Sequence, residues 1–556
     1  MENEESFLSY IEKSIKENWD LDALTDYEGV TLQYKDVARK IEKLHILFEN
    51  AGVNKGDKIA ICGRNSAAWA AAFLATLTYG AVAVPILHEF TASQVHDIVN
   101  HSEARLLFVG DQVWPQLDEN KMLDLEGIIN IHDYSLLVSR TQSLTDAREH
   151  LNAIFGQRYP KAFRAEHVHY YKENREELAL INYTSGTTSQ SKGVMIPYRA
   201  LWSNLLFAYE VLGSSVKKKD HIISILPLAH MYGMSFEFLF EFSAGCHVFF
   251  LTRVPSPRVV FEAFQRIKPQ IVISVPLILE KIIRKSVMPK LQNPKMKMLL
   301  KLPMINQKIR EKICDKVVDA FGGKFYEIII GGAALNSDVE DFLYKIHFNF
   351  TVGYGATECA PIISYADWRD FRPGSCGKAA PRMKIQIDSK DPYNEVGEIL
   401  VQGDNVMLGY YKNEEATQQA LTKDGWYHTG DLGVLDTDGF LYIRGRSKNM
   451  LLGPSGQNIY PEEIENKLNA LPLVNESLVI QKGTKLYGLV HPDYDEAHSL
   501  GLADSDLMEV MEQNRKDLNA QLPAYECLSG MKLLSEEFEK TPKRSIKRFL
   551  YADIEI

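Results

Sequence analysis

The sequence contains few cysteines, and they show no pairing pattern. The six cysteines of the 556-residue chain are Cys62, Cys246, Cys314, Cys359, Cys376 and Cys527. Their scattered spacing, without any Cys-x-x-Cys pair, favours neither a disulfide framework nor a zinc site. We therefore expect a reducing compartment and place the chain in the cytoplasm.

The chain also lacks an excess of positive charge. Lysine and arginine together number 62 and aspartate and glutamate number 73, which gives a formal net charge of -11. Because no overall cationic field attracts phosphate backbones, general binding of nucleic acid is disfavoured. Local basic patches are still compatible with this composition.

The sequence indicates neither a secretory leader nor a membrane span. Residues Met1 to Glu5 are acidic, whereas a leader has a basic start followed by an apolar run. The most apolar window, Met234 to Leu251, contains Glu237 and Glu241, which makes it a poor membrane span. We expect a buried helix and a buried strand in this window.

Short apolar runs alternate with segments of helical length through most of the chain. A chain this long, with 45% hydrophobic residues, is expected to divide into two or more domains. Lys58 to Ile61 predicts a strand, Asn65 and Ser66 can cap a helix that runs to Tyr79, and Ala81 to Val84 predicts another strand. Further strands are predicted at Arg105 to Val109, Ile222 to Leu226, His247 to Leu251, Gln270 to Val275 and Tyr326 to Ile330. The fold class is therefore α/β, with a large body of layered sheets.

The pattern changes twice after Gly374. Short strands punctuated by glycine, such as Gly397 to Val401, predict a small β-barrel-like subdomain within the body. Residues 447–556 then read as a compact α+β tail, with a helix predicted at Glu462 to Leu471. This size suits a separate, mobile domain. We accordingly divide the chain into an N-terminal domain, residues 1–446, and a C-terminal lid domain, residues 447–556.

The stretch from Tyr183 to Met195, YTSGTTSQSKGVM, is interpreted as a phosphate-handling loop. Apolar runs on both sides predict strands that anchor it. Gly186 and Gly193 allow close approach of the backbone to an anion, and Lys192 supplies a positive charge. The hydroxyl donors of the loop are Thr184, Ser185, Thr187, Thr188 and Ser189. The pattern is not the common nucleotide-binding one, and on composition alone a solvated linker is an equal alternative.

Six further stretches have chemical meaning beside this loop. They are LPLAHMYG at 226–233, IGGAAL at 330–335, GYGATE at 353–358, WYHTGD at 426–431, RGRSK at 444–448 and GQNIYPEEIE at 456–465. In this order and over nearly the whole chain, the sequence resembles the adenylate-forming superfamily of acyl- and aryl-CoA synthetases, peptide-synthetase adenylation domains and beetle luciferases. Bacterial long-chain fatty acyl-CoA ligases are the members it resembles most.

The resemblance implies a reaction in two steps. A carboxylate attacks the α-phosphorus of ATP and releases pyrophosphate, and the acyl-adenylate then meets a thiol. The implied cofactors and co-substrates are ATP, Mg²⁺ and coenzyme A. Loop hydroxyls and Lys192 would stabilise the charge that develops on the phosphate, with Mg²⁺ held by Glu358 and Thr184. Thr357 would contact the α-phosphate, and His230 would gate the carboxylate pocket.

The resemblance also assigns the nucleotide pocket and the hinge. Asp431 and Arg446 would hold the ribose, and Lys448 would be the pivot between body and tail. The adenine pocket would be formed by Gly332, Ala333, Tyr354 and Gly355. The loop residues Thr184, Ser185, Gly186, Thr187 and Thr188 would hold the phosphates.

The tail departs from the family pattern at the position of its catalytic lysine. The family ends in Pro-x-x-x-Gly-Lys or a close variant, whereas here Arg544 replaces the glycine and Ser545 the lysine. Lys543 and Lys547 flank Ser545 on the same side of an extended segment. We predict that Lys543 is the catalytic residue. A silent nucleotide or acyl-adenylate binding protein is the alternative.

The expected substrate is a fatty acid of medium to long chain, since Phe236, Phe238, Phe240 and Phe242 after His230 offer walls for an acyl channel. A related alternative delivers the acyl group to the phosphopantetheine of a carrier protein. Between Lys281 and Lys316 there are eleven basic and two acidic residues. Such a segment suits peripheral contact with the inner membrane face, and a solvated basic face is the simpler alternative.

Overall fold

The apolar runs of the first half of the chain form the largest sheet. The computed structural model describes residues 6–184, 191–253, 256–286, 303–453, 457–541 and 545–556. Eight strands lie in the order β20 (Gly409–Tyr410), β9 (Lys192–Pro197), β8 (Leu178–Thr184), β4 (Val82–Ile86), β3 (Lys58–Cys62), β5 (Ala104–Val109), β6 (Gly127–Asn130) and β7 (Leu136–Ser139). The central pairs are parallel, and β8 and β9 form an antiparallel pair. The phosphate loop predicted from the sequence therefore connects two paired strands.

Several helices pack around this sheet and share the hydrophobic core of this half of the chain. They are α1 (Phe7–Glu17), α2 (Tyr34–Asn50), α3 (Ala67–Tyr79), α4 (Ala92–Ser102) and α7 (Tyr198–Leu212). Helix α3 is buried along almost its whole length and packs against α2. Ser66 accepts a hydrogen bond from the backbone N–H of Trp69 at its start, and Gly80 ends it in the left-handed region at φ 85°. The predicted βαβ unit is confirmed.

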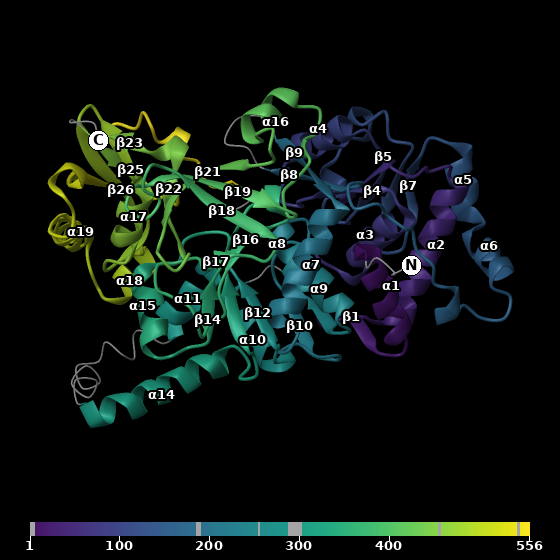
Figure 1. The fold of residues 1–556 in the computed structure, drawn as a ribbon, viewed down its shortest axis with the longest axis horizontal. Helices are drawn as coiled ribbons and strands as arrows, with labels where there is room; N and C mark the ends of the chain where they lie inside the picture. The colour runs from purple at the N-terminus through teal and green to yellow at the C-terminus, as the bar shows by residue number, and fades with distance from the viewer. Residues whose placement is uncertain (1–5, 185–190, 254–255, 287–302, 454–456, 542–544) are drawn as a thin grey trace.

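Two further sheets continue the body. One has the order β10 (His221–Ser224), β11 (His247–Phe250), β1 (Asp22–Asp26) and β2 (Thr31–Gln33). The other is the parallel sheet β12 (Ile271–Ser274), β13 (Glu327–Ile330) and β14 (Phe350–Val352). Around it lie α10 (Pro257–Ile267), α11 (Pro276–Ser286), α14 (Pro303–Ala320) and α15 (Ser337–Lys345). In Figure 1, α14 projects away from the body at its lower left.

The glycine-punctuated region forms an open sheet. Its order is β18 (Met383–Asp388), β19 (Gly397–Gly403), β21 (Tyr427–Leu435) and β22 (Leu441–Arg446), all antiparallel neighbours. Strands β18 and β22 are its two edges, so the barrel-like closure expected from the sequence does not occur among the described residues. A short sheet of β15 (Tyr354–Gly355), β16 (Ile362–Tyr365) and β17 (Lys378–Ala379) lies in the same part of the chain.

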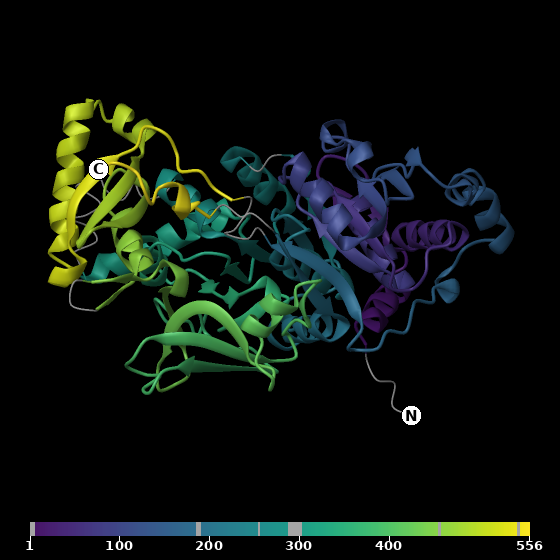
Figure 2. The same cartoon turned by 90° about the horizontal axis from the view of Figure 1, so that it is seen from above.

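The tail forms a small α+β unit at one end of the molecule (Figures 1 and 2). Its sheet is β25 (Val474–Lys482), β26 (Lys485–Pro492) and β27 (Leu528–Leu533), and a hairpin of β23 (Leu451–Leu452) and β24 (Asn458–Ile459) precedes it. Helices α17 (Pro461–Asn469), α18 (Tyr494–Ser499) and α19 (Asp504–Asn519) complete the tail, which has a hydrophobic cluster built from its own residues. A large body with a C-terminal α+β domain is thus confirmed.

The apolar window at 234–251 is buried, as predicted from its two glutamates. It forms a π-helical stretch, Ser235–Leu239, then α9 (Phe240–Ser243) and β11. Within the described ranges, every helix is either too short or too polar to cross a membrane.

Candidate active site

The carboxyl ends of parallel strands gather several of the predicted residues. Gly332 and Ala333 follow β13, and Tyr354 and Gly355 follow the neighbouring strand β14. In open α/β sheets, ligands bind at this edge. Gly332 has φ 85°, and a Cβ at Gly355 would lie 2.4 Å from the carbonyl oxygen of Pro361. Both positions therefore require glycine.

Glu358 and Lys192 are joined through a tyrosine that the sequence analysis did not single out. The hydroxyl of Tyr410 donates to Oε1 of Glu358 at 3.0 Å, and Nζ of Lys192 lies 4.8 Å from the centre of the Tyr410 ring. Strand β20 holds Tyr410 beside Val194 of β9. Burial and the Glu358 carboxylate raise the pKa of Tyr410, so its hydroxyl stays protonated and donates. A cation and a carboxylate thus face the same small region.

The residues predicted to hold the ribose lie in contact with each other and with Tyr354. Tyr354 donates from its hydroxyl to Oδ2 of Asp431 at 2.6 Å, and Nε of Arg446 lies 3.3 Å from Oδ1 of Asp431. Asp431 and Arg446 are register partners on β21 and β22. Burial raises the pKa of Asp431, although Arg446 and Tyr354 act in the opposite direction. Each carboxylate oxygen keeps a lone pair for a further donor such as a sugar hydroxyl.

A glutamate that the sequence analysis missed holds the part of β21 that precedes Asp431. Oε1 of Glu398 accepts from the backbone N–H of Gly430 at 2.9 Å, and Oε2 lies 2.9 Å from Nδ1 of His428. The hydroxyl of Thr429 donates to the carbonyl of Ile399 and accepts from the N–H of Asp431. The pairing of Glu398 with residues 428–430 of β21 arises from strand register, which no local pattern could reveal.

His230, predicted to gate the carboxylate pocket, lies at the start of the short helix α8 (Met231–Met234). Nδ1 of His230 accepts from the backbone N–H of Tyr232 at 3.3 Å. The hydroxyl of Tyr232 donates to the carbonyl of Ile329, and a Cβ at Gly331 would lie 3.1 Å from the Tyr232 ring. The His230 turn therefore packs directly on the loop that carries Gly332.

The four phenylalanines after His230 do not form one wall. All four are buried, but Phe236 packs against Phe207 and Tyr232, and Phe240 packs against Tyr209. Phe238 contacts Phe250, and Phe242 contacts Tyr34. Phe238 and Phe242 also contact each other. The four rings therefore divide between two sides of the helical stretch, with Phe236 and Phe240 facing α7. Only Phe236 contacts the tyrosine of the His230 turn.

The phosphate side is described in part. The Thr184 hydroxyl donates to the carbonyl of Lys192 at 3.5 Å, and Thr357 is buried in a short 3₁₀ helix beside Glu358. The loop residues Ser185, Gly186, Thr187 and Thr188 lie outside the described residues, as does Lys543. The described part of the chain thus places Lys192, Thr357 and Glu358 at one side of the candidate site.

The predicted oxygen donors Glu358 and Thr184 are of the type that Mg²⁺ prefers. Groups of three or more His, Cys, Asp and Glu side chains that could hold a metal are absent from the described residues. Mg²⁺ takes oxygen ligands and is commonly held by one or two carboxylates plus substrate phosphates. Glu358 supplies such a carboxylate, and Thr184 supplies a hydroxyl oxygen.

The junction between body and tail is spanned by polar contacts. Lys448 is exposed in a short helix, Ser447–Asn449, directly after β22. Arg444 of β22 pairs with Glu463 of α17 at 3.1 Å, and the N–H of Ser337 donates to Oδ1 of Asn466 at 3.3 Å. These contacts hold the tail against the body in the orientation of Figure 2.

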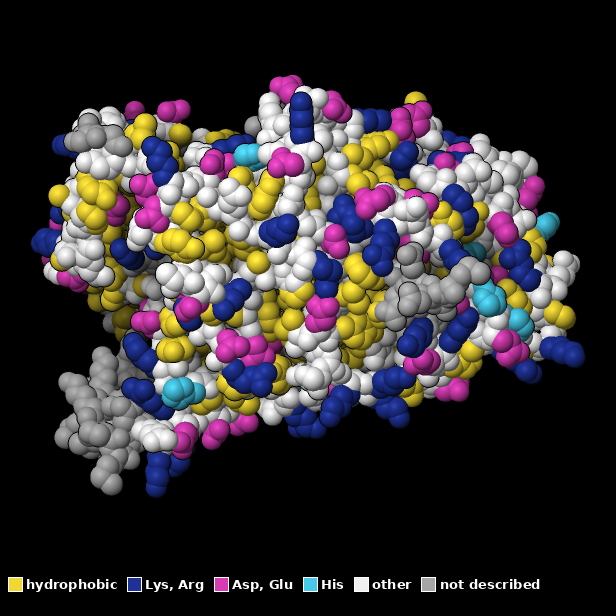
Figure 3. Space-filling view, viewed as in Figure 1, with side chains coloured by type: hydrophobic (Ala, Val, Ile, Leu, Met, Phe, Trp, Pro, Cys, Tyr) yellow, Lys and Arg dark blue, Asp and Glu magenta, His cyan; other side chains and the backbone are white. Residues whose placement is uncertain are grey.

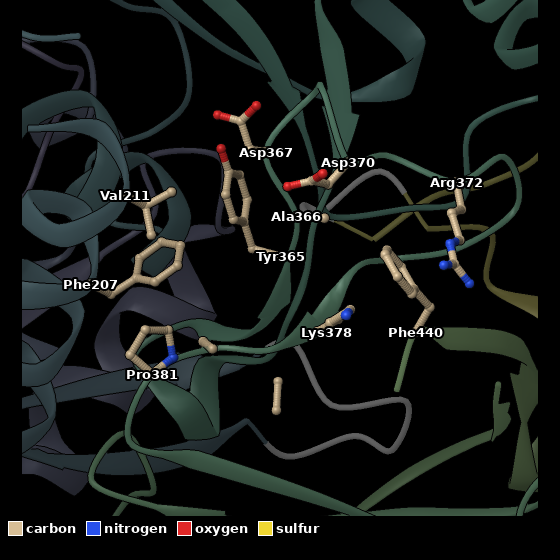
Figure 4. Close-up of a pocket in the computed structure, with 12 residues that line it drawn as sticks. Phe207, Val211, Tyr365, Ala366, Asp367, Asp370, Arg372, Lys378, Pro381 and Phe440 are labelled. Carbon is tan, nitrogen blue, oxygen red and sulfur yellow. The ribbon is translucent and has the colours of Figure 1, made fainter. Parts of the chain in front are cut away.

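A pocket of about 460 Å³ lies elsewhere, between α7 and the end of β16 (Figure 4). Its walls include Phe207, Tyr365, Lys378 and Phe440, with Asp367 and Asp370 at one end and Arg372 at another. None of the predicted site residues lines it. Arg372 is already paired with Asp436 and Asp438, so its charge is satisfied within the protein.

Comparison with known proteins defines the class. Residues 11–411 match the family described as AMP-binding enzyme, so the chain belongs to the AMP-binding enzyme family. It is 25% identical over 558 residues to the long-chain-fatty-acid–CoA ligase FadD15 of Mycobacterium bovis, covering 93% of this chain and 90% of that protein. It is 27% identical over 488 residues to the long-chain-fatty-acid–CoA ligase ACSBG2 of Rattus norvegicus, covering 82% and 71%.

The fold is shared with solved structures of the same class. The anthranilate CoA ligase AuaEII in complex with anthranoyl-AMP superposes with a TM-score of 0.79 at 20% identity, over 98% of this chain and 96% of that one. This likeness establishes the adenylate-forming fold. AMP-binding acyl-CoA ligases use ATP, Mg²⁺ and CoA, the set that the sequence resemblance implied.

Proposed function

We propose that the chain is an acid–thiol ligase that activates a fatty acid with ATP and transfers the acyl group to coenzyme A. The observation that carries the proposal is the proximity of two described clusters: Glu358, which Tyr410 links to Lys192, lies close enough to Asp431 of the Asp431–Arg446 pair to add to the rise that burial causes in the pKa of that carboxyl. Fatty acid as the substrate class is supported by the names of the relatives that match nearly the full chain.

In the first step, a carboxylate oxygen of the acid bonds to the α-phosphorus of ATP, and the bond to the bridging oxygen of pyrophosphate breaks. Lys192 and the Thr357 hydroxyl stabilise the negative charge on the phosphate oxygens as fixed donors. Glu358 and Thr184 would hold Mg²⁺, which when bound neutralises triphosphate charge. Asp431, Arg446 and the glycine edge after β13 orient the nucleoside.

In the second step, the CoA sulfur bonds to the acyl carbon, and the bond from that carbon to AMP breaks. Both steps use one site with different partners, so we assign Lys448 as the pivot of a mobile lid formed by residues 447–556. Support comes from the separate hydrophobic cluster of the tail and the few polar contacts that cross the junction.

The His230 turn supports the acyl side of the proposal. Tyr232 and Phe236 are adjacent, and Tyr232 lies against the Gly331 backbone. We assign these two rings, rather than the whole run of four phenylalanines, to the inner wall of the acyl channel. His230 would gate the entrance for the carboxylate.

Product analysis separates the proposed acceptor from a carrier protein. The chain is incubated with ATP, Mg²⁺ and palmitate, together with either CoA or a phosphopantetheine-bearing carrier protein, and products are resolved by mass spectrometry. We expect palmitoyl-CoA and AMP. Acylation of the carrier alone would overturn CoA as the acceptor, and ATP binding without pyrophosphate release would identify a silent binder.

Peripheral contact with anionic lipid through Lys281 to Lys316 stays a prediction. Residues 287–302 of that segment lie outside the described residues, and its described part includes the exposed Lys308, Lys312 and Lys316 of α14. Co-sedimentation with liposomes that does not change with anionic lipid content would remove this prediction.

A further inference from the structure

A second pocket lies at the opposite edge of the sheets from the candidate active site. It has a volume of about 330 Å³ and is formed where β10, β12 and β13 begin. Lys219 and His221 come from the start of β10, Lys268 from the end of α10, and Lys324 from the segment before β13. Arg266 completes the set of basic side chains. Figure 3 shows Lys and Arg side chains along the lower edge of the molecule, below the position of α10 and β10 in Figure 1.

The positive charge of this pocket is poorly compensated. Lys219, Lys268 and Lys324 form no ion pair with any residue that the structure describes, and Arg266 reaches Glu28 only at 3.6 Å. Asp220 is the acidic residue of the pocket lining. Its Oδ2 atom already accepts from the backbone N–H of Lys217 at 2.7 Å. Four cations therefore surround a hollow that contains a single carboxylate.

The backbone places these lysines in fixed positions. Lys219 and Lys268 both have left-handed φ angles, 71° and 54°, which side-chain-bearing residues adopt rarely. The N–H of Lys219 donates to the carbonyl of Gly245, and the N–H of Lys268 donates to that of Phe264. A Cβ on Gly322 would lie only 3.0 Å from Cα of Lys268, so that turn is closely packed. The backbone at Lys219 and Lys268 is thus held by the surrounding structure.

Strand direction separates the pocket from the nucleotide site. Strands β10, β12 and β13 each have four residues, and the predicted site residues His230, Gly332 and Ala333 come after the carboxyl ends of β10 and β13. A strand of that length spans about 13 Å. Anions bound at the two edges would therefore not touch each other or share residues.

We propose that this pocket is a second anion site, which binds a small phosphate-bearing molecule. Lysine ammonium groups favour phosphate, and a few hundred Å³ is the size of small-ligand pockets. The ligand is either a free phosphorylated compound or the headgroup of an anionic lipid, because both present the same phosphate chemistry. The inference goes beyond the proposed function and does not depend on it.

The test uses inorganic pyrophosphate as the probe and the full chain as the protein. The variant Lys219→Gln/Lys268→Gln/Lys324→Gln removes three charges and leaves a neutral, polar side chain at each position. The control Lys161→Gln/Lys423→Gln/Lys485→Gln makes the same charge change at exposed lysines outside the pocket. Calorimetry in a magnesium-free buffer measures pyrophosphate binding to the control and to the pocket variant. The pocket variant should lose one site that the control shows, or bind pyrophosphate there about tenfold or more weakly, as expected when charged donors are lost.

A measurement on the unmodified protein covers the case in which the triple variant does not fold. Acetylation of surface lysines is followed by mass spectrometry with and without pyrophosphate. We expect protection of Lys219, Lys268 and Lys324 and no protection of Lys161, Lys423 and Lys485. Equal binding by both variants, or equal acetylation with and without the probe, would overturn the proposal.

Vesicles with and without phosphatidic acid distinguish the two sources of phosphate. If the control variant binds phosphatidic-acid vesicles more strongly than the pocket variant does, the site takes a lipid headgroup. If both variants ignore the vesicles and only pyrophosphate binding differs, the ligand is free in solution. ATP–pyrophosphate exchange should be the same in both variants, which keeps this result separate from the fate of the proposed function.

Discussion

Tyr410 connects the two charged residues on the phosphate side of the candidate site. Its ring faces Lys192 and its hydroxyl holds Glu358, so the carboxylate has a fixed direction before any ligand arrives. Preorganised charges of this kind need no rearrangement when the reaction begins. Two substitutions separate the charge of Glu358 from its orientation.

Glu358→Gln should lower ATP–pyrophosphate exchange by about one hundredfold or more, since it removes a charged ligand from the metal and phosphate region. Tyr410→Phe keeps the carboxylate and loses only the hydrogen bond that orients it. We expect it to raise the Mg²⁺ concentration for half-maximal exchange with a smaller loss of maximal rate. A Glu358→Gln enzyme with an unchanged rate and Mg²⁺ dependence would refute the assignment.

The tail lysines differ in what already surrounds them. Nζ of Lys547 lies 3.3 Å from Glu539, and the neighbouring Ile546 belongs to a hydrophobic cluster with Phe538. The N–H of Thr541 donates to the carbonyl of Ser545 at 2.8 Å, so the two residues that flank 542–544 are adjacent. Lys547 therefore already has an acidic partner within the tail. We keep Lys543 as the predicted catalytic lysine.

Lys543→Ala should cut adenylation by about one hundredfold or more, because a preorganised donor to the phosphate is lost. Lys547→Ala should have a smaller effect. Single-turnover formation of the acyl-adenylate measures both. Full pyrophosphate exchange in the two single variants and in the double variant would mean that the tail supplies no catalytic lysine.

At the scale of single elements, the short helix Ser447–Asn449 carries the proposed rotation of the tail. Lys448→Pro fixes φ near -65° and should spare adenylate formation much more than thioester formation, because it restricts one rotation. Lys448→Ala is the control, since alanine leaves φ free. The two half-reactions are measured separately, by pyrophosphate exchange and by transfer from preformed acyl-adenylate to CoA. Equal loss in both half-reactions would argue against a hinge.

The helical stretch after His230 contains a buried carboxyl group that makes the free energy of unfolding depend on pH. Glu241 of α9 is fully buried, and neither of its side-chain oxygens has a hydrogen-bond partner among the described residues. Burial raises the pKa of Glu241 from 4.5 to about 8. At a pH between 4.5 and about 8, the Glu241 carboxyl is ionised in the unfolded chain and protonated in the folded chain. Raising the pH through that window therefore lowers the free energy of unfolding.

Glu241→Gln removes this titration. Between about pH 5 and about pH 8.5, we expect a smaller fall in the melting temperature for the variant than for the unmodified protein. The exposed substitution Glu149→Gln serves as the control and should leave the fall unchanged. Parallel melting curves for Glu241→Gln and the unmodified protein over this range would contradict the argument.

Local signals account for the elements that the sequence predicted correctly. The strands near Lys58, Arg105 and Ile222 and the helix that ends at Gly80 were all visible as apolar runs between caps and turns. The roles of Tyr410 and Glu398 were not visible in the sequence. Each contacts its partners only because strands that are distant in sequence pair with each other. Local periodicity carries no information on such pairs.

At the scale of the whole molecule, the sequence indicates a body and a tail. It does not indicate whether the strands of the glycine-punctuated region form a barrel or an open sheet. The glycine-punctuated strands form an open sheet because β18 and β22 each pair on one side only. The basic pocket at the amino ends of β10, β12 and β13 was also invisible, since its lysines come from segments far apart in the sequence. The net charge of -11 gives no information on where basic residues cluster in the folded chain.

The proposed activity is tested most directly by carboxylate-dependent ATP–pyrophosphate exchange over one substrate panel. The panel contains saturated fatty acids of increasing length, benzoate, anthranilate and acetate, with the Glu358→Gln enzyme as the background. The account predicts strong exchange with medium-to-long fatty acids and little with the aryl acids or acetate. Strong exchange with an aryl acid or acetate, and none with any fatty acid, would contradict it.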